Sequence, residues 1–196
     1  MKKDKAMPTC VYIKREKEKN KENNAPKVAD TIRDLYLDRL RKKSKITISD
    51  KISFRVNAEV RYFFGLGKKN VMKAFYPLKT SKKGDYLWLP HLSIQKGNLL
   101  VPKRKMWINL YDEQTGIIRE GYYQDNPPED KIVQINDEIE NFKRITFAKS
   151  ADNSAFHFLG VFEKTGKVEE EEINGRKLIF RIYQRVADNI DTNADY

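Results

Sequence analysis

The chain has 196 residues, a formal net charge of +11 and one cysteine, which excludes an internal disulfide and a cysteine-based zinc site. Hydrophobic residues make up 39% and charged residues 34%, so we expect a folded domain with a polar segment outside its core. No apolar run approaches the length of a membrane span, and the basic N-terminus lacks the apolar region of a signal peptide. The sequence therefore predicts a cytoplasmic protein that does not associate with a membrane.

The charge is divided unevenly along the chain. Residues 1–110 carry 28 Lys and Arg against 10 Asp and Glu, a net of +18, whereas residues 111–196 carry 11 against 18, a net of −7. Such asymmetry favours a polyanionic partner, most commonly nucleic acid, although solubility alone is a simpler explanation. The acidic second half could in turn dock a basic protein partner.

The first two segments are polar and then helical. Residues 1–24 form a basic charged segment that suits either an exposed helix or a disordered tail. Residues 25–44 have apolar side chains at helical spacing, namely Val28, Ile32, Leu35, Tyr36 and Leu40. The cations Arg41, Lys42 and Lys43 fall at the end of this predicted helix, where they also complement its dipole.

Residues 51–64 fit two patterns. Unbroken alternation from Ile52 to Phe64 predicts a strand, while a helical stripe of Ile52, Val56, Val60, Phe63 and Phe64 is also present. We favour the strand, which places Arg55 and Arg61 on one face as candidate phosphate contacts. The glycine-rich stretch that follows is not a phosphate-binding loop, because its Gly-Lys is followed by Lys69 rather than Ser or Thr. Lys68 and Lys69 remain candidate phosphate contacts.

The rest of the chain alternates between strands and one helix. Strands are expected over 85–123, with a hairpin whose loop ends at Gly116, and over 144–187, with a second hairpin at Asn174-Gly175. Residues 126–142 predict a helix, and 189–196 a frayed tail. The four glutamates at 169–172 suit a strand edge that resists pairing. The predicted fold is α+β: a single domain over 25–188 with a mostly antiparallel bent sheet or small β-barrel and two main α-helices.

Basic and aromatic residues recur together in these strands. Lys103, Arg104 and Lys105 precede Trp107; Arg119 precedes Tyr122; and Arg181, Tyr183 and Arg185 fall on one face of the last long strand. Cations neutralise phosphates, and aromatic rings stack on exposed bases for ~1–3 kcal/mol each. The simpler interpretation is that Trp107 belongs to the core and that the cations form a solvated rim.

Catalytic patterns are sparse. His91 lies in a predicted loop and His157 in a strand where a half-buried structural role is expected, and no nucleophile-elbow motif is present. Asp125, Glu129 and Lys131 form the only compact carboxylate–lysine group, at a predicted helix N-terminus. We therefore predict no catalytic residue, metal site or cofactor. A metal-dependent nuclease and a protein-binding inhibitor or assembly module remain alternatives.

The strand order over 85–187, with "WLPHLSI", "MWINLY", "GIIREGYY" and "FHFLGVFE", resembles small β-barrels of the PUA superfamily, which includes EVE and SRA-type domains. The likeness is to modules of modification-dependent restriction enzymes and other phage-defence systems. It implies a barrel that grips DNA or RNA and receives a flipped base in an aromatic pocket. On that implication Trp107, Asp112 and Tyr122 are pocket candidates. DNA binding is the predicted function, with RNA as the alternative.

Overall fold

The structure is a computed structural model that describes residues 28–66, 74–78, 85–96, 99–101, 107–122, 143–149, 155–173 and 175–192. Its helices are α1 (Val28–Arg41), the 3-10 turn η1 (Ile48–Asp50) and α2 (Asn57–Phe63). Its strands are β1 (Lys45–Thr47), β2 (Ser53–Phe54), β3 (Phe75–Pro77), β4 (Tyr86–Trp88), β5 (Ile94–Lys96), β6 (Leu99–Val101), β7 (Trp107–Asp112), β8 (Ile117–Tyr122), β9 (Arg144–Ala148), β10 (Phe156–Ile173), β11 (Arg176–Ala187) and β12 (Asn189–Asp191).

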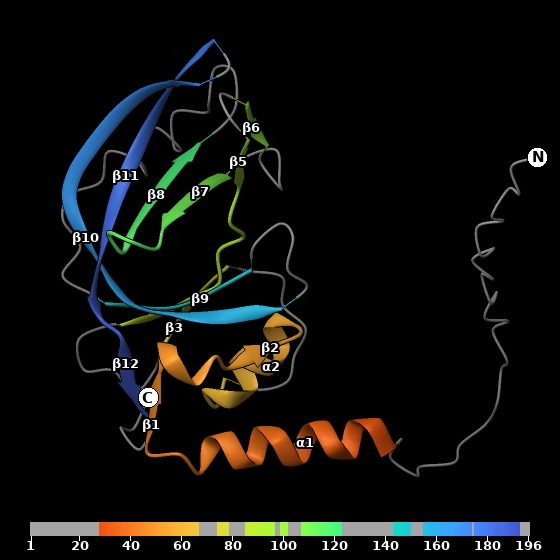
Figure 1. Cartoon of the computed structure of the whole chain (residues 1–196). Coiled ribbons are helices and arrows are strands. Elements are labelled where there is room, and N and C mark those ends of the chain that lie inside the picture. The colour runs from red at the N-terminus through yellow and green to blue at the C-terminus, as the bar shows by residue number, and fades with distance from the viewer. Residues whose placement is uncertain are drawn as a thin grey trace, which may run out of the picture.

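An eight-stranded sheet is the centre of the fold. Its order is β3-β4-β9-β10-β11-β8-β7, with β2 added to β10, and every pair is antiparallel except β4–β9. The sheet bends into two layers, one with β3 and β9 and the other with β7, β8 and β11 (Figure 1). The predicted α+β fold with a bent, mostly antiparallel sheet is confirmed, and the sheet stays open rather than closing into a barrel.

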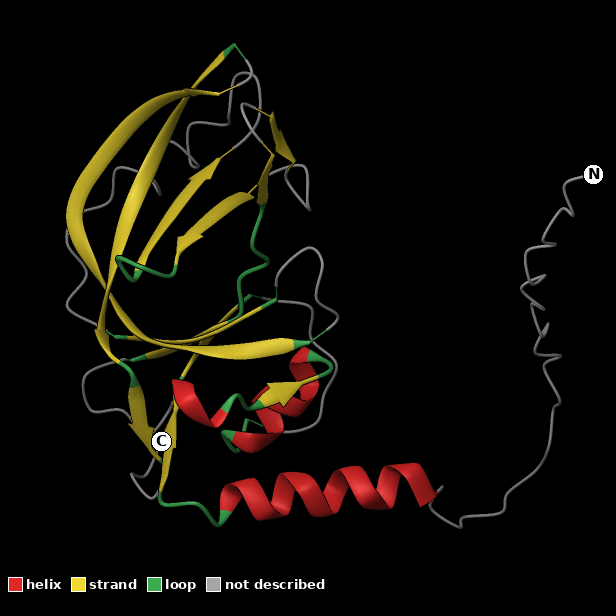
Figure 2. Ribbon diagram, in the orientation of Figure 1, coloured by secondary structure: helices red, strands yellow, loops and turns green. Residues whose placement is uncertain are grey.

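The bend is made by β10, the strand common to both layers (Figure 2). Its first part pairs with β9 and its longer second part with β11, and the register shifts between Phe158 and Gly160, between Val161 and Phe162, and between Lys164 and Val168. Such irregularities increase local twist and redirect a strand. Gly160 has φ 118°, and a Cβ there would lie 2.6 Å from the carbonyl oxygen of Ala187. Glycine is therefore required where the sheet turns.

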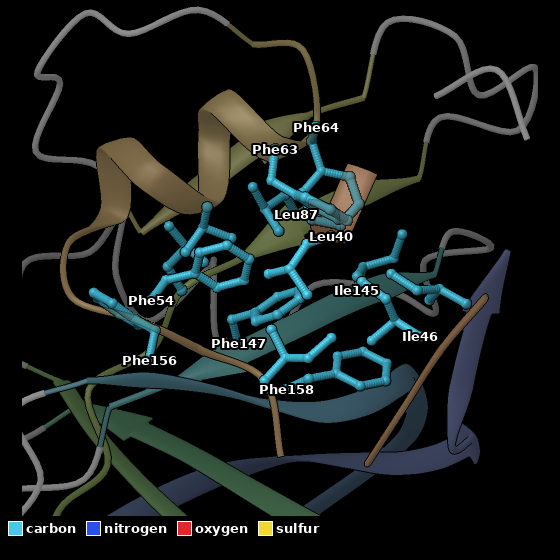
Figure 3. Close-up of a cluster of buried hydrophobic side chains, with 14 of the residues drawn as sticks. Leu40, Ile46, Phe54, Phe63, Phe64, Leu87, Ile145, Phe147, Phe156 and Phe158 are labelled. Carbon is cyan, nitrogen blue, oxygen red and sulfur yellow. The ribbon is translucent and has the colours of Figure 1, made fainter. Parts of the chain in front are cut away.

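Both helices pack on one side of the β9–β10 layer, where aromatic rings fill the largest core cluster (Figures 1 and 3). Phe54, Phe64 and Phe158 all contact the ring of Phe147, with centroids 5.1–5.9 Å apart. The predicted helix at 25–44 is confirmed as α1. Its apolar stripe was only partly right, because Leu35 is 61% exposed while Leu37 is buried.

The strand favoured over 51–64 is wrong for most of that segment. Only Ser53 and Phe54 extend, and Asn57–Phe63 form α2. The helical arrangement places Val60, Phe63 and Phe64 together in the core, which an extended chain with alternating faces would not do. Alternation in this segment coincided with a helical stripe, and tertiary burial selected the helix.

The two predicted hairpins are confirmed by the β7–β8 and β10–β11 pairings. Residues 189–191, expected in a frayed tail, instead form β12 and pair with β1. The N-terminal segment 1–24 and the helix predicted at 126–142 lie outside the described residues. Within the described part of the chain, no helix is both long enough and apolar enough to span a bilayer.

Candidate nucleic-acid interface

The β7–β8 hairpin and β11 present two faces with different chemistry. Cross-strand register places Trp107 opposite Tyr122, Asn109 opposite Glu120, and Glu120 opposite Arg181. Residues that oppose each other directly project to the same side of an antiparallel sheet. We call this side the inner face, because its Tyr183 contacts Trp88 and Arg144 of the other layer, with the two ring centroids 5.0 Å apart. The opposite side, which carries Leu110, Asp112 and Arg119, is the outer face.

One end of the inner face combines aromatic rings with polar groups. The rings of Trp107 and Tyr122 meet edge to face, with centroids 5.2 Å apart and an interplanar angle of 84°. Tyr122 is 5% exposed, whereas Trp107 is only partly buried, so the indole retains a solvent-facing part. Trp107, interpreted from the sequence as either a core residue or a stacking platform, packs against Tyr122 and is partly exposed.

Asn109 and Glu120 lie next along this face. The Asn109 amide nitrogen donates to the carbonyl oxygen of His91 at 3.2 Å, which orients the amide. Its Oδ1 is buried and, within the described residues, has no hydrogen-bond partner. A buried acceptor without a partner is costly, which makes it a candidate contact for a ligand donor. Sequence analysis missed both residues, although the hairpin alternation that selected Trp107 and Tyr122 also selects them.

A charged network lies deeper on the same face. The Tyr183 hydroxyl donates to a Glu120 carboxylate oxygen at 3.1 Å and accepts from Arg181 at 3.1 Å. Burial, and then the negative charge of Glu120, raise the pKa of Tyr183 far above its usual range, so the phenol stays protonated. Tyr183 is 0% exposed and Arg181 6%, which contradicts the exposed Arg-Tyr-Arg face expected from β11. The reason is the bend of the sheet, which covers both faces of this strand.

Four other described arginines were predicted to contact nucleic acid: Arg61, Arg119 and Arg185 are engaged in the fold, and Arg55 is largely exposed. Arg61 is 7% exposed and donates to the carbonyl oxygen of Leu66 at 3.0 Å, so the surface role expected from a strand at 51–64 does not fit its burial. Arg119 forms an ion pair with Glu171 at 2.6 Å on the outer face. Arg185 donates to the hydroxyl of Tyr111 at 3.0 Å. Arg55 has a side chain that is 67% exposed, 3.6 Å from Glu59.

Asp112 lies at the far end of the hairpin from Trp107 and Tyr122, so the three proposed pocket residues do not meet. It pairs with Ile117, and its carboxylate accepts from the Thr115 hydroxyl at 2.7 Å and from the Gln114 N–H at 2.9 Å. These contacts, the Thr115 hydroxyl first, hold the pKa of Asp112 below its usual value. Asp112 borders an outer-face cavity of about 520 Å³, together with Ser93, Leu110, Tyr111, Thr115, Ile117, Arg119 and Glu169. The hydrogen bonds within the hairpin loop are a sufficient structural reason for a carboxylate at position 112.

Five further predicted cations, Lys68, Lys69, Lys103, Arg104 and Lys105, lie outside the described residues, as do the nuclease candidates Asp125, Glu129 and Lys131. Among the described residues, no group of three His, Cys, Asp or Glu could hold a metal ion. His91 contacts the ring of Phe156 edge-on at 5.6 Å, and His157 is half-buried in β10, as expected. The described chain thus offers an aromatic and polar contact surface and no set of metal ligands.

Comparison with models of protein families identifies the family of the chain. A family model described as the SET and RING associated domain, or SRA, matches residues 39–192. The chain belongs to the SRA domain family. The resemblance noted in the sequence over 85–187 is confirmed, and the match extends it to include α2 and the end of α1. SRA domains bind modified DNA.

Three solved structures align with this SRA domain at low identity, and one of them, AbaSI, shares its fold. The 5-hydroxymethylcytosine-specific restriction enzyme AbaSI aligns over 88% of this chain with a TM-score of 0.55 and 16% identity, and the match spans 59% of the AbaSI chain. The DNA modification-dependent restriction endonuclease AspBHI aligns over 72% of this chain and 76% of its own, with a TM-score of 0.41 and 10% identity. Arabidopsis thaliana SUVH6 aligns over 72% and 26%, with a TM-score of 0.34 and 9% identity. No curated protein matches the chain in sequence.

Proposed function

We propose that this SRA domain binds DNA and recognises a modified base that has turned out of the duplex. The observation that carries the proposal is the inner-face end of the β7–β8 hairpin. There the partly exposed Trp107 ring, held edge-on by Tyr122, lies beside the Asn109 Oδ1 acceptor and the Glu120 carboxylate. An extruded base is held by stacking and by hydrogen bonds to its edge, which requires this combination of side chains.

The biological setting that we propose is restriction of modified foreign DNA. Support comes from family membership and from the fold shared with AbaSI, whose modified base is 5-hydroxymethylcytosine. A duplex partner also suits the net +18 of residues 1–110, since phosphate contacts by Lys and Arg release counterions. This domain would supply recognition in such a system, as part of a longer protein or alongside a separate nuclease.

The test is a binding series with one duplex that carries cytosine, 5-methylcytosine or 5-hydroxymethylcytosine at a single position, with RNA of the same sequence as a fourth arm. We expect tighter binding to a modified duplex than to the unmodified one. Trp107→Ala should lower that affinity by about tenfold, because one stacking contact is worth ~1–3 kcal/mol. Asp112→Ala is the matched control, since this residue lies at the opposite end of the hairpin, and its affinity should match that of the unsubstituted protein.

Equal affinity for all DNA arms, unchanged by Trp107→Ala, would rule out recognition of a base at this face. Tighter binding to RNA would favour the RNA alternative. Incubation of the same protein with plasmid and Mg²⁺ or Mn²⁺ tests the nuclease alternative, which metal-dependent cleavage that survives purification would support.

A further inference from the structure

The outer-face cavity of about 520 Å³ is separate from the proposed base contact. Its lining comes from the β7–β8 hairpin, with Leu110, Asp112, Ile117 and Arg119, and from β10, with Glu169. Cross-strand register pairs Leu110 with Arg119, and Asp112 with Ile117, on the side of the sheet opposite the inner face. A ligand in this cavity is therefore distinct from a base bound at the inner face.

The lining of the cavity favours a positively charged ligand. Asp112 and Glu169 contribute carboxylates, and the Thr115 hydroxyl, followed by loop N–H groups, lowers the pKa of Asp112 and keeps it ionised at neutral pH. The charge of Arg119 is already balanced, because its Nη1 lies 2.6 Å from Glu171 Oε2 and 3.8 Å from Glu169 Oε2. A phosphate or a DNA strand would be repelled here, whereas a cation would be attracted.

Two groups of the lining have hydrogen-bonding capacity that the described residues do not use. The Glu169 side chain is 53% exposed, and its 3.8 Å ion pair with Arg119 is longer than a hydrogen bond, so its oxygens can accept further donors. The Ser93 hydroxyl oxygen is buried and has no partner within the described part of the chain. Because buried polar groups nearly always have a partner, Ser93 points to a donor or acceptor from outside these residues.

An arginine side chain matches this combination of groups. Leu110, which is 8% exposed, and the partly buried Ile117 belong to one apolar cluster and can cover the aliphatic part of such a side chain. A guanidinium group has five donors in a planar fork and can reach two carboxylates at once, which a compact ammonium does less well. A metal ion does not fit, since no group of three His, Cys, Asp or Glu in the described residues could hold one.

We propose that the outer-face cavity is a docking site for an arginine-containing basic segment of a partner protein, whose guanidinium group contacts Asp112 and Glu169. The surroundings favour a segment over a single small cation, because the exposed Glu170 and Glu172 extend the negative charge along β10, and residues 111–196 carry a net −7. Charge complementarity of this kind steers a basic partner to the outer face. The partner can bind while DNA lies on the inner face, and the inference does not depend on base recognition.

The test uses a fluorescein-labelled peptide of alternating arginine and glycine, with a second peptide that carries citrulline in place of arginine. Citrulline keeps the length of the side chain and lacks the charge. Binding to the whole chain is measured by fluorescence anisotropy without DNA, at about 0.15 M salt, where distant charges are screened. The arginine peptide should bind about tenfold more tightly than the citrulline peptide, because charge-assisted hydrogen bonds are the stronger ones.

Two neighbouring substitutions locate the contact. Glu169→Gln should weaken binding of the arginine peptide by about fivefold, because it removes the charged acceptor of the cavity. Glu170→Gln is the matched control: it removes the same charge from the next residue, which projects to the other side of β10, and should leave the affinity nearly unchanged. Both side chains are more than half exposed, at 53% and 55%, so both variants should fold.

Equal losses in the two variants would mean that the peptide responds to net charge rather than to the cavity, and would overturn the proposal. Equal binding of the arginine and citrulline peptides would overturn it as well. Light scattering of the protein alone tests a second copy as the occupant, and a dimer that Glu169→Gln dissociates would exclude a separate partner. The affinity of Glu169→Gln for DNA should match that of the unsubstituted protein, so failure here leaves the Trp107 series to decide the proposed function.

Discussion

Arg33 of α1 donates two hydrogen bonds to the carboxylate of Glu59 in α2, from Nε to Oε1 at 2.9 Å and from Nη2 to Oε2 at 2.5 Å. The same guanidinium donates to the carbonyl oxygen of Ser53 at 3.1 Å, and Glu59 accepts the backbone N–H of Arg55 at 2.7 Å. One ion pair therefore joins both helices to the short β2 strand. Glu59 thereby also satisfies the backbone N–H of Arg55, the residue before Val56, the N-cap of α2.

Loss of this carboxylate should destabilise the domain. The Glu59 and Arg33 side chains are 13% and 20% exposed, so solvent replaces the missing hydrogen bonds poorly in Glu59→Gln. We expect a decrease in the free energy of unfolding of about 2 kcal/mol at pH 7, measured by urea denaturation. Asp38→Asn is the matched control, because that carboxylate is exposed on α1. Equal effects of the two substitutions would show that the bidentate pair contributes nothing specific.

The same pair gives a pH dependence of defined sign. Burial alone would raise the pKa of Glu59, but the Arg33 hydrogen bonds, the Arg55 N–H and the two positive charges outweigh it and lower the pKa below its ordinary 4.5. A carboxylate whose pKa is lowered by folding stabilises the protein fully above its unfolded value, and the contribution is lost as pH falls through the folded value. The stability difference between the unsubstituted protein and Glu59→Gln should therefore shrink below about pH 4.5. A constant difference down to pH 3 would contradict it.

Local patterns were enough for the hairpins of the sheet but not for its shape. The alternation around Gly116 and the Asn-Gly at 174–175 predict two hairpins that the structure contains. The bend depends on the irregular pairing of β10 with β9 and β11, which no local pattern encodes. Alternation failed at α2 for a different reason: Val60 and Phe64 satisfy both periods, and the helix also brings Phe63 into the core cluster that contains Phe54 and Phe147.

The selected aromatic residues and the selected arginines differ in where the structure places them. Trp107 was selected beside the basic run 103–105 and Tyr122 because it follows Arg119, and the structure brings the two rings together. Arg61 and Arg181 were selected as cations on an exposed face, and both are buried with oxygen acceptors or aromatic rings. Sequence alone does not show whether an arginine binds an outside phosphate or an internal acceptor, because long side chains suit both. Only the packing of the folded chain shows which of the two partners an arginine has.

The turn in β10 should depend on the absence of a side chain at Gly160. In Gly160→Ala the new methyl group would lie 2.6 Å from the Ala187 carbonyl oxygen and 2.7 Å from Arg185 Cδ, at a φ of 118°. We expect a loss of unfolding free energy of about 3 kcal/mol, from backbone strain together with overpacking. Gly65→Ala is the control, since its φ is also positive, at 68°, but nothing lies within 4 Å of the added atom. If both variants lose the same free energy in urea denaturation, strain alone accounts for the effect and the close approach to Ala187 does not matter.

The run Lys103, Arg104 and Lys105 should bind phosphates beside the base-contacting end of the inner face, because it ends two residues before Trp107. Charge reversal of all three (K103E/R104E/K105E) should weaken binding to every DNA sequence by a similar factor. The slope of log affinity against log salt should fall by about 0.9 for each phosphate that the variant no longer neutralises. The control reverses three exposed lysines: Lys42 directly after α1, Lys45 in β1 and Lys51 directly after η1. Both α1 and β1 lie at the helical end of the molecule, away from β7 (Figure 1). Fluorescence anisotropy at several salt concentrations measures both slopes.

If the 103–105 variant leaves the slope unchanged, this run is not part of the interface. An equal decrease in the control would mean that the net charge of the protein, rather than the position of the run beside Trp107, sets the affinity.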